Sequence, residues 1–211
     1  MLKFKEYIEE SRVNDTRKTQ VSTTGGTYFK TGQFLKDKIP ANGKIISIGA
    51  GLSHTKKALK DGLGKGKHVI HDMEPNPEGR DEPPEFTSGD QIPHDAYHAA
   101  VSHNVLNVVE PEVRDSVMDS IFDSLKTGGH AVIGTRKWTG DISKAKNYDA
   151  GSEPKSMWVK KGEATSYQKG FDGNDLKDYV LDYAQKKGYN VDVNKLNGIA
   201  ATSVHVKLNS K

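Results

Sequence analysis

The turn Gly49-Ala50-Gly51 is the feature that most restricts the fold of this 211-residue chain. It follows the apolar run at residues 44–48 and precedes a helix-like stretch at residues 53–60. Two glycines between a strand and a helix let the backbone approach a ligand without a Cβ in the way. A strand, a glycine turn and a helix in this order predict an α/β sheet that binds its ligand beyond the carboxyl ends of its strands.

The rest of the chain repeats this alternation. We expect strands at residues 68–71, 97–102 and 131–134, and helices at 175–187 and from Pro111 to the Gly128-Gly129 pair. Two further strands are expected at residues 189–193 and 203–208. No helix separates them, which predicts that they pair in antiparallel fashion at the end of the sheet. The pattern indicates a doubly wound, Rossmann-like α/β domain over residues 41–211, with mostly parallel strands.

Two other parts of the chain follow different patterns. Residues 1–40 are expected to form an N-terminal extension, with short helices at 1–10 and 28–38 around a polar loop. Residues 136–170 form a long polar segment that contains both tryptophans, Trp138 and Trp158. A lid over the ligand site and a surface that stacks on bases are two interpretations of this second segment.

Asp72 is the main candidate for recognition of the ligand. It ends the second predicted strand, where a carboxylate typically accepts hydrogen bonds from a ribose diol. The alternative is a tight turn next to a solvated aspartate. A dinucleotide fingerprint needs a third glycine, and His54 stands in its place, which argues against NAD.

Composition excludes several classes of protein. The chain has no cysteine, which rules out disulfides, thiolate catalysis and cysteine-ligated zinc. Its mean hydropathy is −0.72, and no apolar run approaches the roughly 18 to 20 residues that span a bilayer. The opening residues lack the apolar block of a signal peptide, so we expect a cytoplasmic protein without a membrane partner. The histidines form no pattern typical of a metal site, and the oligomeric state stays open.

The charge is unevenly distributed. Residues 1–70 carry a net charge of +8, residues 71–130 of −10 and residues 131–211 of +5. Basic flanks favour a polyanion such as DNA, although ordinary solvated surface explains them equally well. The candidate cations for nucleic acid are Arg17, Lys18, Arg136, Lys137, Lys160 and Lys161.

The motifs resemble those of the class I S-adenosylmethionine-dependent methyltransferases. Residues 45–53, 71–75, 87–90 and 95–109 are similar to the family's first four motifs, and residues 125–133 to its Gly-Gly unit before a strand. The resemblance implies a seven-stranded sheet with a reversed last strand, and S-adenosylmethionine as cofactor. It implies that the cofactor-binding residues are Gly49, Ala50, Gly51, Asp72, Met73, Asp90 and Ser102, with Asp90 at the adenine.

Two departures from the family pattern keep a second class of function open. Ser47 stands where the family usually has an acidic residue, and Ser53 where it often has a third glycine. Losing a charged contact to the cofactor weakens binding by about 1.5–3 kcal/mol. A protein that binds the cofactor without transferring the methyl group, or that degrades it, is therefore an alternative.

The methyl acceptor is not specified by the motifs. The fourth motif here is Ser102-His103-Asn104-Val105-Leu106-Asn107, without the Pro-Pro signature of amino-methylating DNA enzymes. We expect His103 and Asn104 to face the acceptor as catalytic residues, because a neutral imidazole with a pKa of about 6.5 can remove a proton. The alternative for His103 is a histidine hydrogen-bonded at the end of a strand.

A fainter resemblance points to DNA. Residues 102–109 and 165–171 are similar to segments of methyltransferases associated with DNA phosphorothioation, and residues 4–11 to the N-termini of tailed-phage proteins. It implies a DNA-modifying, phage-encoded enzyme that acts in the host cytoplasm. The missing Pro-Pro signature favours a small molecule or a protein as the acceptor instead.

Overall fold

The computed structural model describes residues 25–51, 54–75, 82–144, 148–161 and 164–211. The helix expected at residues 1–10 therefore lies outside the described residues. The first described helix is α2 (Gly25–Leu35), close to the helix expected at 28–38. No helix in the described ranges is both long enough and apolar enough to cross a membrane.

The main sheet has the strand order β2-β1-β3-β4-β9-β8. Its first four strands pair in parallel, and β9 runs antiparallel to both of its neighbours. The Rossmann-like class with an antiparallel last strand is thus confirmed. The strands are β1 (Lys44–Ile48), β2 (Val69–Met73), β3 (Tyr97–His103), β4 (Leu125–Thr135), β8 (Asn190–Leu196) and β9 (Thr202–Ser210).

The described sheet has six strands and not the expected seven. Beside β2, where the family pattern places its outermost strand, the described residues contain a single parallel bridge between Met73 and Phe86. The Phe86 N–H donates to the carbonyl of Asp72 (3.1 Å), and the Glu74 N–H donates to the carbonyl of Phe86 (3.0 Å). Residues 76–81, which precede this bridge, lie outside the described part of the chain.

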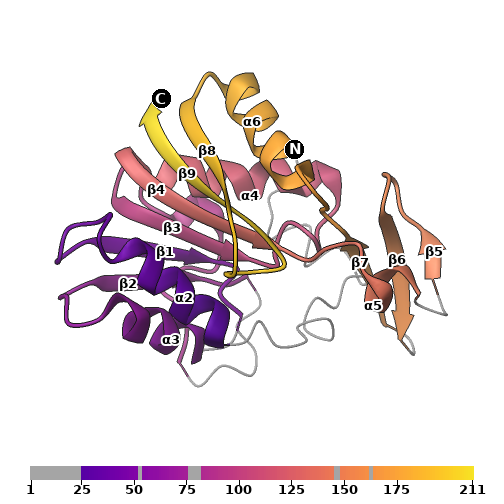
Figure 1. Ribbon diagram of the computed structural model, residues 1–211, viewed down its shortest axis with the longest axis horizontal. Coiled ribbons are helices and arrows are strands. Elements are labelled where there is room, and N and C mark those ends of the chain that lie inside the picture. The colour runs from indigo at the N-terminus through magenta and orange to yellow at the C-terminus, as the bar shows by residue number, and fades with distance from the viewer. Residues whose placement is uncertain (1–24, 52–53, 76–81, 145–147, 162–163) are drawn as a thin grey trace.

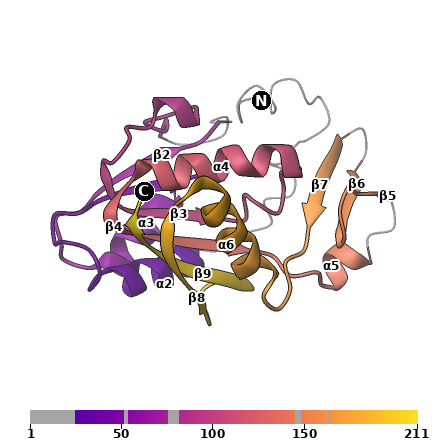
Figure 2. The same ribbon diagram turned by 90° about the horizontal axis from the view of Figure 1, so that it is seen from above.

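Helices cover both faces of the main sheet (Figures 1 and 2). On one face, α2 and α3 (His54–Leu63) pack through Leu35 and Leu59 against Ile45 of β1. On the other face, α4 (Pro111–Ser124) and α6 (Asp175–Lys187) enclose the larger core. Because apolar residues cover β1 and β3 on both sides, functional groups reach the ligand only from the strand ends.

The boundary between α4 and β4 differs from the expectation. The helix ends at Ser124, and β4 begins at Leu125, so Gly128-Gly129 lies within the strand and does not terminate the helix. Leu125 has an extended backbone and pairs with Tyr97, and its side chain is fully buried. Burial of Leu125 in the sheet therefore outweighs the helical pattern to which it belongs. The pairing of β3 with β4 shifts register between Tyr97 and Ala99, and Gly128 lies in the irregular part of β4 with a φ of +81°.

The polar segment at residues 136–170 contains regular secondary structure that the sequence pattern did not indicate. After the short helix α5 (Gly140–Ser143), the chain forms an antiparallel sheet of β5 (Tyr148–Ala150), β6 (Ser156–Lys161) and β7 (Ala164–Lys169). We call β5–β7 the insert sheet. It lies beyond the end of β4, separate from the main sheet (Figure 1).

Candidate functional site

The strand order places the candidate site at the carboxyl ends of β1, β2 and β3. The chain passes from β1 to β2 on one side and then crosses to β3 on the other side of β1. In a doubly wound sheet, the crevice outside the strand ends at such a reversal binds the ligand. The predicted glycine turn follows β1 at this point.

The glycine turn is hydrogen-bonded to the end of β2 and packs against Val105, which follows β3. The N–H groups of Gly49 and Ala50 donate to the carbonyl of Met73, at 2.8 and 3.3 Å. Gly49 and Gly51 have φ values of +65° and +62°, which glycine adopts without a steric penalty. A Cβ on Gly49 would also overlap the side chain of Val105. The turn therefore needs glycine for its backbone shape and, at Gly49, for space.

A buried carboxylate closes the turn from the side of β2. The Gly51 N–H donates a 2.7 Å hydrogen bond to Oε2 of Glu74. The Glu74 side chain is 6% exposed. Glu74 was not among the residues predicted to bind the cofactor, although residues two apart at a strand end share a face. That spacing from Asp72 is the signal that could have identified it.

Asp72 lies on β2, two residues before Glu74. It is fully buried, and it is the register partner of Ser47 on β1. Its backbone N–H donates to the carboxylate of Glu85 (2.7 Å), which also accepts a hydrogen bond from Lys56 (2.6 Å). Asp72 is thus at the predicted strand end, while Glu74 is the carboxylate that contacts the glycine turn.

His103 is covered by α2. Its Nε2 lies 2.8 Å from the hydroxyl of Thr31, and its ring meets the ring of Tyr28 edge-on at 5.1 Å. The side chain is 3% exposed, and burial lowers the pKa of His103 to about 3. The imidazole is consequently neutral at physiological pH and is held in place by the helix.

The residues on either side of His103 differ in exposure. Ser102 is buried, whereas Asn104 is half-buried and has a φ of +59°. The Asn104 N–H donates to the carbonyl of Gly134 (2.8 Å), so the chain turns sharply where β3 ends beside β4. Of the two predicted catalytic residues, Asn104 is the more accessible in this arrangement.

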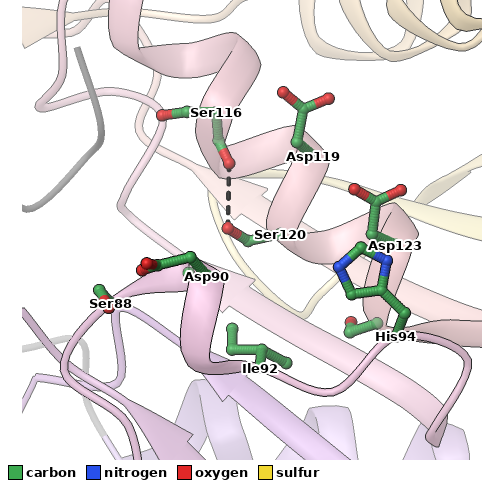
Figure 3. Close-up of a pocket in the computed structure, with 10 residues that line it drawn as sticks. Ser88, Asp90, Ile92, His94, Ser116, Asp119, Ser120 and Asp123 are labelled. Carbon is green, nitrogen blue, oxygen red and sulfur yellow. Dashed lines mark hydrogen bonds between the residues drawn. The ribbon is translucent and has the colours of Figure 1, made fainter.

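Asp90 lies on a different part of the surface. It belongs to the short 3-10 helix η2 (Gly89–Gln91) and lines a hollow of about 180 Å³ between η2 and α4 (Figure 3). Acidic and hydroxyl side chains of α4 form the opposite wall, among them Ser116, Asp119 and Ser120.

A buried polar cluster attaches the insert sheet to α4. Arg114 of α4 donates from Nε to the carbonyl of Leu106 (2.7 Å) and forms an ion pair with Glu153. The Tyr167 hydroxyl donates to Oε1 of Glu153 (2.6 Å). Burial acts to raise the pKa of Glu153, but the hydrogen bonds from Arg114 and Tyr167 outweigh it and keep the pKa below its usual value. The insert sheet is therefore anchored by charge-assisted contacts.

A basic hollow of about 190 Å³ lies where the β8–β9 hairpin meets the beginning of α6. Three lysines, Lys137, Lys177 and Lys195, line it, and its lining contains no acidic side chain. Within the described ranges, none of these three ammonium groups has an ion-pair partner. The hollow is thus suited to an anion.

The other candidate cations are arranged differently. Arg17 and Lys18 lie outside the described residues. Arg136 is half-buried, and burial lowers its pKa. Lys160 forms an ion pair with Asp149 (2.6 Å), and Lys161 is the last residue of β6. Of the four candidate cations within the described residues, Lys137 lines the basic hollow.

The two tryptophans belong to separate elements. The backbone N–H of Trp138, in the segment after β4, donates to the Asp172 carboxylate (2.9 Å). Trp158 lies on β6, where its ring meets Tyr167 edge-on at 5.3 Å. Within the described ranges, no ring contact joins the two tryptophans.

Solved structures with this fold are numerous. A methyltransferase dependent on S-adenosylmethionine from Clostridium acetobutylicum has a TM-score of 0.58 at 10% identity, covering 92% of this chain and 94% of its own. A similar enzyme from Aquifex aeolicus has a TM-score of 0.53 at 11% identity, covering 92% and 96%.

A third similar structure contains a bound cofactor product. It is 1,6-didemethyltoxoflavin-N1-methyltransferase from Burkholderia thailandensis, with S-adenosylhomocysteine and its substrate bound. Its TM-score is 0.52 at 10% identity, covering 97% of this chain and 85% of its own. No family model matches the sequence, and no curated protein matches it. At these identities the comparisons show that the chain has the fold of S-adenosylmethionine-dependent methyltransferases.

Proposed function

We propose that this chain is an S-adenosylmethionine-dependent methyltransferase. The observation that carries the proposal is the glycine turn, which leaves β1 at the reversal of strand order and is fixed by Met73 and Glu74 of the neighbouring strand. Gly49 and Gly51 have positive φ values, and Val105 packs so closely against Gly49 that a Cβ there would overlap it. A glycine turn of this kind beside a carboxylate fits a nucleoside ligand.

The residue types around this turn match the chemical groups of the cofactor. Gly49, Ala50 and Gly51 would lie along its methionine and ribose parts. Glu74 would accept a hydrogen bond from a ribose hydroxyl, with Asp72 as the second carboxylate at the same strand end. Met73 and Ser102 would line the site from the ends of β2 and β3, and Asp90 keeps its proposed role at the adenine through the family resemblance alone.

The position of Ser47 supports cofactor binding in spite of the departure from the family pattern. Ser47 is the register partner of Asp72, so their side chains point to the same face of the sheet. The acidic residue that the family has on β1 is absent, but a carboxylate is present on the adjacent strand. A small residue at position 47 leaves room for that carboxylate.

The protein's part in the transfer is mainly positioning. Bound S-adenosylmethionine supplies a methyl group on a positively charged sulfur, and the acceptor atom has to lie in line with it. We propose that Asn104 contacts the acceptor, since it is half-exposed at the sharp end of β3. His103, neutral and bound to Thr31, is proposed to hold that strand end in position.

Nucleic acid is the acceptor that we propose, and the basic hollow favours it. Three lysines without acidic neighbours suit phosphate groups. Two fainter resemblances agree with DNA: that of residues 102–109 and 165–171 to methyltransferases associated with DNA phosphorothioation, and that of residues 4–11 to the N-termini of tailed-phage proteins. A small molecule is the competing acceptor, and the similar enzyme named for 1,6-didemethyltoxoflavin is an example of that class.

Calorimetry tests the cofactor, and product analysis tests the transfer. We expect S-adenosylmethionine and S-adenosylhomocysteine to bind with micromolar affinity and NAD not to bind. Incubation with S-adenosylmethionine and DNA should then produce S-adenosylhomocysteine and methylated DNA. Cofactor binding without product in the presence of DNA would favour a different acceptor or a binding protein. Binding of NAD alone would contradict the proposal.

A further inference from the structure

Two carboxamide side chains are buried beside the site without hydrogen-bond partners. Asn107 follows β3 and is 0% exposed, and Gln168 lies on β7 and is 3% exposed. In each side chain, both the amide nitrogen and the amide oxygen lack a partner. Buried amides are nearly always paired in folded proteins, and an unpaired one destabilises the fold.

The backbone brings the two residues together. The N–H of Lys169, next to Gln168, donates to the carbonyl of Asn107 (2.8 Å). The N–H of Phe171 donates to the carbonyl of Arg136 (2.9 Å). The end of β7 therefore lies across the ends of β3 and β4, at the edge of the main sheet that carries the candidate site.

The surrounding structure does not explain the unpaired amides. In the adjacent polar cluster, Arg114, Glu153 and Tyr167 are joined by an ion pair and a hydrogen bond. Two further buried hydroxyls at the strand ends, those of Ser102 and Thr135, also lack partners. Unpaired polar groups thus collect at one edge of the sheet, where a ligand would use them.

We propose that Asn107 and Gln168 recognise the base of the methyl acceptor. A carboxamide presents a donor and an acceptor side by side, which pair with a heterocycle that carries the complementary groups on one edge. The inference rests on the proposed function and specifies its substrate as a nucleobase. Because the four amide atoms are shielded from solvent, the end of β7 moves away from Asn107 to admit the base.

Side-chain amide signals in ¹⁵N NMR spectra report base binding without requiring activity. Asn107→Leu and Gln168→Met remove the amides at nearly constant volume and assign their two signals. Adenosine, guanosine, cytidine and thymidine are the probes, each titrated with and without saturating S-adenosylhomocysteine. We expect at least one nucleoside to shift both wild-type signals, and either substitution to weaken its binding at least tenfold. No shift with any of the four nucleosides would overturn the proposal.

Thermal stability separates recognition from a structural role. If the two amides serve to bind a ligand, the ligand-free protein bears the free-energy penalty of burying them unpaired. Removing either amide relieves that penalty, and the Tm of each variant should rise by about 2–4 °C. Amides that support the fold through ordered water would instead lower the Tm on substitution, which would overturn the proposal. Exposed Gln185→Met and Asn194→Leu are matched controls that should change neither property.

S-adenosylhomocysteine affinity distinguishes this inference from the proposed function. Both variants should bind it as the wild type does, because neither side chain is hydrogen-bonded to the glycine turn. A wild type that fails to bind it while nucleosides still shift the amide signals would overturn the cofactor assignment alone. Loss of its binding in the two variants would identify the amides as part of the cofactor site and overturn base recognition.

Discussion

Glu74 accepts a 2.7 Å hydrogen bond from the backbone N–H of Gly51. This contact joins the end of β2 to the glycine turn after β1, across the strand pair where a ligand is expected. The carboxylate is nearly buried, so a lost contact is poorly replaced by water. Glu74 therefore has two tasks in our proposal, shaping the turn and presenting an acceptor to the ribose.

Glu74→Gln should weaken S-adenosylhomocysteine binding at least about tenfold. The amide keeps the size of the side chain but removes a charge-assisted hydrogen bond of about 1.5–3 kcal/mol. Calorimetric titration of the folded variant measures the change. Exposed Glu112→Gln, on the surface of α4, is the matched control and should retain wild-type affinity. If Asp72→Asn weakens binding and Glu74→Gln does not, Asp72 is the ribose carboxylate, as the sequence predicted.

Gly49→Ala should destabilise the fold and weaken cofactor binding together. A non-glycine residue at φ +65° costs about 1–2 kcal/mol, and the overlap with Val105 adds to this. Gly64→Ala is the matched control, because Gly64 has a φ of +78° but open space around it. Thermal unfolding should show the larger loss of Tm for Gly49→Ala, and calorimetry should show weaker binding for that variant alone. Equal losses of Tm in the two variants would indicate that the close packing of Val105 against Gly49 is unimportant.

Replacing Lys137, Lys177 and Lys195 by alanine should weaken DNA binding and reduce its salt dependence. Each lost phosphate contact lowers the slope of log affinity against log salt by about 0.9 for duplex DNA. Filter binding at several salt concentrations measures this slope, and calorimetry should find unchanged S-adenosylhomocysteine affinity. The exposed set Lys36, Lys65 and Lys207, replaced in the same way, controls for net charge. Absence of wild-type DNA binding at low salt would favour a small-molecule acceptor.

Folding stability should fall in acid partly because of His103. The pKa of His103 is about 3 in the folded protein and about 6.5 in an unfolded chain. As the pH falls below about 6.5, the unfolded chain takes up a proton that the folded chain excludes. Stability present at neutral pH is therefore lost towards pH 3, by at most about 1.4 kcal/mol per pH unit.

Urea unfolding between pH 7 and pH 4 measures the contribution of His103. His103→Gln removes the titrating group while keeping a side chain that can hydrogen-bond to Thr31, so its stability should depend less steeply on pH. Exposed His94→Gln should follow the wild type. An unchanged slope in His103→Gln would mean that His103 is accessible to protons in the folded protein.

The local sequence was sufficient to predict the main sheet and the glycine turn. The apolar runs that became β1 and β3 are short and bounded by turn residues, and Gly49 and Gly51 have positive φ values that their residue type suggests. These signals depend on neighbouring residues, because periodicity and backbone preference act within a few positions along the chain. The Gly188 end of α6 was predictable for the same reason.

The insert sheet and the details of the site were decided by contacts between distant residues. The strands β5–β7 are short and polar, so their stability comes from the junction with α4, which includes the Arg114–Glu153 ion pair. Leu125 joined a strand, although it fits the helical pattern, because pairing with Tyr97 buries it completely. The partners in these contacts, Glu153 for Arg114 and Tyr97 for Leu125, are too distant along the chain to be predicted from neighbouring residues.

The state of each candidate group was likewise set by the tertiary structure. The sequence by itself determined that His103 ends β3 and that Asn107 and Gln168 are carboxamides. Only the fold decided that α2 covers His103 and lowers its pKa, and that β7 crosses the end of β3 beside Asn107. Burial and hydrogen-bond pairing depend on which segments meet in space, and that choice is made by the free energy of the whole packed chain.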